Sequence, residues 1–75
     1  GVVEVASAAL SAAHVKELAV TMTIQHLRHA GVPISTIHDF LTNDIGVAPR
    51  LVNRFINISA AELEAAQARI LAIAF

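Results

Sequence analysis

The sequence predicts an all-α domain, built as a small bundle of four to five helices. Two observations predict this fold class: apolar residues recur at helical spacing along separate stretches, and helix stop and start residues lie between those stretches. We expect a long central helix at about residues 12–30, two helices joined by a tight turn at about 36–57, and a C-terminal helix at about 60–74. Residues 1–10 are expected to form an arm or a weak helix of the same domain, residues 1–75.

The composition predicts apolar surface that a monomer does not cover. Hydrophobic residues make up 56% of the chain and charged residues 15%, whereas a charged share of about 25% is usual. A domain of this size also buries only about 60% of the surface that its unfolded chain exposes. We therefore expect a homodimer, or a partner protein, to cover the surplus apolar area.

Several kinds of structure are excluded by residues that the chain lacks. It has no cysteine, so disulfides and thiolate zinc sites are excluded. The longest stretch without Asp, Glu, Lys or Arg is residues 5–15, and the stretch 29–38 is shorter. Both are well short of the ~20 residues that a membrane span needs. The beginning of the sequence carries Glu4 and no basic signal-peptide region. A cytoplasmic protein without membrane contact is therefore the default expectation.

The central helix, residues 12–30, is clearly delimited because Gly31 and then Pro33 supply stop signals. Its polar side chains fall in one sector of roughly 80°, and apolar side chains occupy most of the remainder. We expect such a helix to pack on other helices on two sides, or on one side and across a dimer axis. Val20 and Ile24 are therefore candidate interface residues.

Residues 36–57 have the pattern of a helix-turn-helix. Ser35 or Thr36 is expected to cap the first helix. Gly46 is expected to take the left-handed conformation that a sharp turn needs, and Pro49 suits the first turn of the second helix. The apolar residues expected to point inward are Ile37, Leu41, Ile45, Val47, Val52 and Phe55.

The second helix of this helix-turn-helix-like unit has two different faces. Its polar side chains fall within an arc of roughly 100°, and its apolar side chains lie opposite. The polar residues are Arg50, Asn53, Arg54 and Asn57. Arginine bonds phosphate and guanine, and asparagine bonds adenine or phosphate, so this face is a candidate DNA-binding surface. Alternatively, the same residues bind a partner protein or form a solvated face.

The run GVAPRL at residues 46–51, together with Arg54 and Phe55, resembles the recognition segment of AraC-type transcription regulators. In that family a glycine, a hydrophobic residue, a small residue and a proline lead into a basic helix that ends in phenylalanine. The resemblance covers a short part of the chain. It implies a DNA-binding domain in which Arg50, Asn53 and Arg54 are directed toward the major groove.

Two functions fit these observations. The first is a small helix-turn-helix-type transcriptional regulator domain that binds DNA as a dimer, because one copy offers only two arginines and a dimer doubles the contacts. The second is a helical protein-protein interaction module, such as an antiactivator or adaptor that docks on a regulator without binding DNA. The formal net charge of −1 weighs against a strongly DNA-binding surface, but it does not decide between the two functions.

Ser59 and Glu62 form a capping-box pattern that predicts the start of the last helix, at about residues 60–74. Its inward stripe is expected to consist of Leu63, Ala66, Ile70 and Ile73. Leu71 and Phe75 lie off that stripe by roughly a quarter turn or more. They are therefore candidates for an interface outside the monomer core.

No catalytic or metal site is predicted. The chain has no nucleophile elbow, glycine-rich phosphate loop or paired-carboxylate spacing, and a small helical domain has little volume for a substrate pocket. His26 and His29 lie three residues apart, but His26 falls beside Met22 in the apolar sector. We expect it to be a core or interface histidine instead of a metal ligand. No enzyme activity and no cofactor are expected.

Overall fold

The computed structural model describes residues 12–74, with side chains described up to Ile73. All regular structure in these residues is helical, which confirms the all-α prediction. The elements are α2 (Ala12–His29), α3 (Ile34–Asp39), the π-helical segment η1 (Phe40–Ile45), α4 (Pro49–Phe55) and α5 (Ala60–Ala74). The predictions for residues 1–10 and for Phe75 lie outside the described residues.

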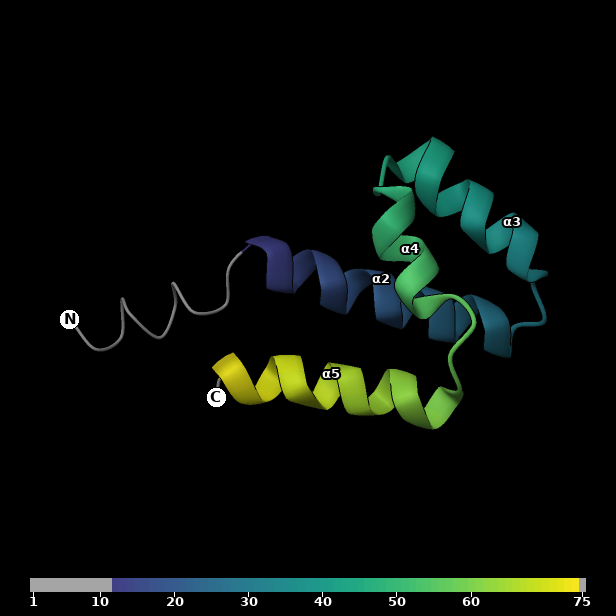
Figure 1. Ribbon diagram of the computed structural model, residues 1–75. Helices are drawn as coiled ribbons and strands as arrows, with labels where there is room; N and C mark the ends of the chain where they lie inside the picture. The colour runs from purple at the N-terminus through teal and green to yellow at the C-terminus, as the bar shows by residue number, and fades with distance from the viewer. Residues whose placement is uncertain (1–11, 75) are drawn as a thin grey trace.

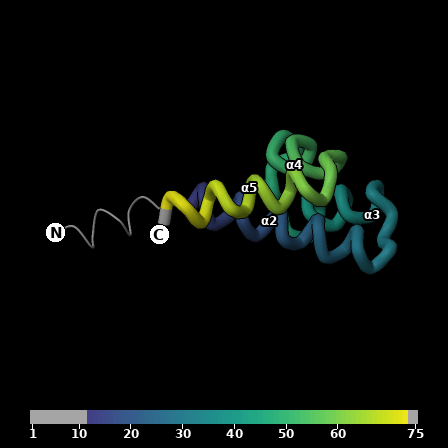
Figure 2. Tube along the Cα trace, turned by 90° about the horizontal axis from the view of Figure 1, so that it is seen from below, coloured from purple at the N-terminus to yellow at the C-terminus, as the bar shows by residue number. Residues whose placement is uncertain are grey.

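The long helices α2 and α5 lie side by side and run in opposite directions (Figure 1). The direction can be followed by colour, from purple to blue along α2 and from green to yellow along α5. Figure 2 shows the same pair from below. The shorter helices α3 and α4 gather over the C-terminal half of α2 (Figure 1). The bundle therefore has α2 at its centre, as the sequence predicts.

The end of α2 follows from a glycine in the left-handed conformation. Gly31 has a φ of 84°, which glycine adopts without steric cost. Its N–H donates to the carbonyl of Arg28 at 3.0 Å, and the N–H of Val32 donates to the carbonyl of Leu27 at 3.0 Å. These are the two bonds of a Schellman motif. The Arg28 guanidinium also donates to the carbonyl of Ile58, which ties the end of α2 to the loop before α5.

The second helical segment begins earlier than predicted. Neither Ser35 nor Thr36 is its cap: α3 begins at Ile34, and the N-cap is Pro33, without a side-chain cap bond. The carbonyl of Pro33 accepts the N–H of Ile37 at 3.0 Å. Because the ring of proline fixes φ near the helical value, a proline can lead directly into a helix without a hydroxyl cap.

The segment then widens into a π-helical turn, η1, before it ends. The Oγ1 of Thr42 donates to the carbonyl of His38 at 2.8 Å. A threonine inside a helix often bonds the carbonyl four residues earlier in this way. Gly46 ends η1 with a φ of 85°, as predicted, and the N–H of Val47 donates to the carbonyl of Leu41 at 2.8 Å.

Ile45 is expected to point inward, but the structure places it on the surface with 58% of its area exposed. A π-helical turn contains more residues than the 3.6 of an α-helix, on which the prediction depends. Side chains near the end of η1 are therefore rotated away from the expected face. Ile37 and Leu41, which come earlier in the segment, are buried as predicted.

The core lies where α2 meets the other helices. Its buried apolar residues are Val20, Ile24, Ile37, Leu41, Val47, Val52, Phe55, Ile56, Leu63 and Ala66. The structure corrects the interface prediction for Val20 and Ile24, which are 2% and 0% exposed. This side of α2 packs on α3, α4 and α5. Val20 and Ile24 are therefore core residues of the monomer, and a partner chain cannot contact them.

The cap of α5 is the one that the sequence predicts. The N–H of Glu62 donates to Ser59 Oγ at 3.1 Å, and the Ser59 hydroxyl donates to Glu62 Oε1 at 3.2 Å. The inward residues Leu63, Ala66 and Ile70 are buried, as predicted. Ile73 is exposed instead. The reason is that α3 and α4 lie over the other end of the helix pair (Figure 1), so the last turn of α5 has only α2 beside it among the described residues.

Candidate binding surface on α4

The inner face of α4 holds this helix on the protein. The helix begins at Pro49, and Val52 and Phe55 are buried beneath it. The C-cap residue, Ile56, is buried as well. Figure 1 shows α4 lying across α2, so the opposite face of α4 points to solvent.

The four polar residues predicted for this surface share the solvent side. Arg50, Asn53, Arg54 and Asn57 are all exposed. The helix ends at Phe55, so Asn57 lies in the turn after α4 and extends the surface beyond the helix. Within residues 12–74, the side chains of Arg50, Asn53 and Asn57 form no hydrogen bond or ion pair. They are therefore available to a ligand.

Among the described residues, Arg54 is the member of this set that has partners. Its Nη1 donates to Glu17 Oε1 of α2 at 2.6 Å, and its Cζ lies 5.6 Å from the centre of the Phe55 ring. The Arg54 side chain is 63% exposed and that of Glu17 24%, so solvent screens the ion pair and it stabilises the fold by about 1 kcal/mol or less. The sequence does not point to Glu17, because this residue lies 37 positions from Arg54 along the chain.

The unit formed by α3, η1 and α4 carries as many acidic as basic side chains. Arg50 and Arg54 are balanced by Asp39 and Asp44, two against two, so its formal net charge is zero with histidine neutral. Both aspartates are exposed. Recognition of an anion here therefore depends on the local face of α4 and not on a general positive field.

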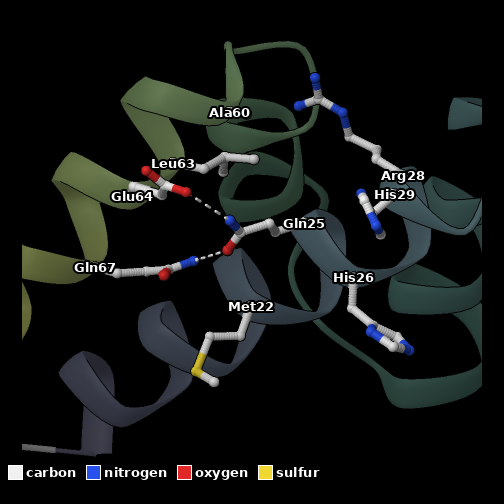
Figure 3. Close-up of a pocket in the computed structure, with 9 residues that line it drawn as sticks. All are labelled: Met22, Gln25, His26, Arg28, His29, Ala60, Leu63, Glu64 and Gln67. Carbon is white, nitrogen blue, oxygen red and sulfur yellow. Dashed lines mark hydrogen bonds between the residues drawn. The ribbon is translucent and has the colours of Figure 1, made fainter.

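An open groove of about 660 Å³ runs between α2 and α5 (Figure 3). Gln25 bridges it: its Nε2 donates to Glu64 Oε1 at 3.4 Å, and its Oε1 accepts from Gln67 Nε2 at 2.9 Å. His26 and His29 lie at the groove and are exposed. Of the two positions expected for His26, in the core or at an interface, the core position is therefore wrong. In the described part of the chain, no group of three or more His, Cys, Asp or Glu residues is placed to hold a metal ion.

A second hollow, of about 480 Å³, lies between α2 and the turn that precedes α4. Its lining includes Lys16, Ala19, Thr23, Phe40, Ile45 and Val47. Phe40 and Ile45 expose much of their apolar area there. The sequence does not reveal this hollow, because helical periodicity places Ile45 inside the core. Exposed apolar surface of this kind is typical of contact with another protein.

Comparisons of the chain with protein-family models, with curated proteins and with solved structures found no match. Among the described helices, none is long and apolar enough to cross a membrane. The function is therefore inferred from two features of the molecule: the polar face of α4 and the apolar surface around α2.

Proposed function

We propose that the protein is a small helix-turn-helix-type transcriptional regulator domain that binds DNA as a dimer through the outward face of α4. The observation that supports it is the exposed polar face of α4, which follows the left-handed turn at Gly46 and is anchored from beneath by Phe55. In this proposal the two arginines contact phosphate or guanine, and the two asparagines contact adenine or phosphate. The cytoplasmic location expected from the sequence belongs to the same proposal.

The charges favour weak DNA binding by each copy. Arg54 is paired with Glu17, and Asp39 and Asp44 lie on the same unit. Each phosphate contact adds only about one unit to the salt dependence, so two arginines per copy give a shallow slope. A dimer doubles the contacts and presents two α4 faces to two half-sites.

Arg50→Ala/Arg54→Ala is expected to weaken binding of a fluorescent mixed-sequence duplex at low salt by about tenfold or more, because both phosphate-binding side chains are lost. Fluorescence anisotropy titrations at low and moderate salt measure the affinity and its salt dependence. Arg69→Ala is the control for charge: Arg69 is exposed on α5, so this variant loses one positive charge, against two in the double variant, without touching α4.

The proposal is contradicted by no binding of the wild type at low salt, or by equal binding of the wild type and the double variant. A loss in Arg69→Ala as large as the loss in the double variant also contradicts it. In that case DNA binding follows the total charge and not the face of α4.

The second candidate function is a protein-protein interaction module, such as an antiactivator or adaptor that docks on a regulator. The observation that favours it is the apolar hollow beside η1, where Phe40 and Ile45 are exposed. On this alternative, Arg50 and Arg54 belong to a solvated or partner-binding face. The DNA titration separates the two functions, because the interaction module predicts no specific loss in Arg50→Ala/Arg54→Ala.

A further inference from the structure

One exposed stripe of α2 carries no Asp, Glu, Lys or Arg along its length, and the exposed Lys16 lies beside this stripe. Six exposed residues, at spacings of three, four, three, four and three positions, form what we call the α2 seam: Ala12, Val15, Ala19, Met22, His26 and His29. Val15 is 51% exposed and Met22 54%. Met22 and His26 of α2 also border the groove that Glu64 of α5 lines (Figure 3).

The spacing of the α2 seam is that of the a and d positions in a coiled coil, where one helix packs against another. At 1.5 Å per residue, the seam is about 26 Å long. The exposed side of a helix in a monomeric protein is normally polar and charged. An uncharged seam that extends over the whole helix therefore indicates a second helix packed along it.

Apolar side chains continue on one side of the α2 seam, where Ala19 shares the apolar hollow with Ile45 of η1. On the other side, the groove beside Met22 is lined largely by polar side chains, among them Gln25 and Gln67. Ala19 and Met22 lie at the middle of α2. A twofold axis at this point therefore brings the complete seams of two copies together.

We propose that a second copy of this chain packs on the α2 seam, with the two α2 helices antiparallel. The twofold axis passes between Ala19 and Met22, so that each Met22 lies against the partner's Ala19. Each Val15 then lies against the partner's His26. A large side chain meets a small one at the centre, which fills space evenly.

A parallel pairing of the same seam fits less well. It places Met22 on Met22 and Ala19 on Ala19, which crowds one level of the interface and leaves a gap at another. In the antiparallel pairing, Lys16 lies near the partner's Thr23, so no like charges meet beside the seam. The seam faces away from Val20 and Ile24, and the dimer therefore leaves the core and the outward face of α4 unchanged.

Analytical ultracentrifugation across protein concentration tests self-association without DNA, so its failure is distinct from failure of the DNA-binding proposal. Met22→Glu is expected to raise the dimer dissociation constant by at least about tenfold, because the dimer buries an unpaired charge. Ile34→Glu is the control, since Ile34 is an exposed apolar residue of α3 outside the seam, and it leaves the constant unchanged. A monomeric wild type, or equal effects of the two variants, overturns the proposal.

The helix direction is tested with single cysteines, because the chain has none of its own. Val15→Cys and His26→Cys proteins are mixed in equal amounts and oxidised. The antiparallel dimer predicts a disulfide between the two variants. In a parallel dimer these positions lie about 16 Å apart along the axis, too far for a disulfide, so each variant bonds only to itself. The antiparallel dimer is overturned if each variant forms disulfides only with itself, or if no disulfide product forms.

Discussion

Leu63→Ala is expected to lower the free energy of unfolding by about 2–5 kcal/mol. Leu63 lies in the core on α5 and is 1% exposed, so removing its side chain leaves a cavity between α5 and α2. A small domain has a total stability of about 5–15 kcal/mol. The loss is therefore a large part of the free energy that keeps α5 on the bundle.

Leu71→Ala is the matched control, because it makes the same change on the same helix. Leu71 is 42% exposed, and we expect a loss of about 1 kcal/mol or less. Urea denaturation followed by far-UV circular dichroism measures both variants, at low protein concentration so that self-association does not contribute. Equal losses in the two variants contradict the position of Leu63 in the core.

Phe55→Ala is expected to destabilise the protein by about 3–5 kcal/mol. Phe55 is the largest apolar side chain by which α4 is anchored, and it is 6% exposed. Its ring also lies beside the Arg54 guanidinium. Phe55→Leu keeps most of the apolar volume and is expected to cost less than about 1.5 kcal/mol. The difference between the two variants isolates the contribution of filling the space beneath α4.

Urea denaturation and amide hydrogen exchange check this prediction. Hydrogen exchange is expected to show faster exchange in α4 for Phe55→Ala, because local opening follows the loss of buried contacts. Phe55→Leu serves as the control. If Phe55→Ala costs no more than Phe55→Leu and the exchange of α4 is unchanged, the ring does not anchor this helix.

The fold was predictable wherever local chemistry determines it. Gly31 and Gly46 both have a φ that favours glycine, and both end helical segments at the predicted places. The bond from the Glu62 N–H to Ser59 Oγ fixes the start of α5. Each of these features depends on residues close together in the sequence, which is why a single sequence reveals them.

Other features depend on contacts that the sequence does not display. Helical periodicity gives the apolar side of α2 but not the element that covers it. The sequence therefore places Val20 and Ile24 at an interface, whereas in the structure they are core residues. The π-helical turn changed the direction of Ile45, because the prediction used a constant 3.6-residue period.

The polar face of α4 was predictable, but its electrostatic setting was not. The exposure of Arg50 and Asn53 follows from their positions opposite Val52. The pairing of Arg54 with Glu17 depends on how α4 crosses α2, and no local pattern encodes that crossing. The DNA-binding function stays a proposal, and this ion pair offers a way to test it.

Glu17→Gln tests the proposed role of the α4 face most directly. The variant removes a negative charge beside Arg54 and weakens the bond that holds its guanidinium, while the amide keeps the size of the side chain. If Arg54 contacts DNA phosphate, anisotropy titration at low salt is expected to show about two- to fivefold tighter binding than the wild type. The same change in an Arg54→Ala background is expected to have a much smaller effect. Unchanged or weaker DNA binding by Glu17→Gln contradicts the account.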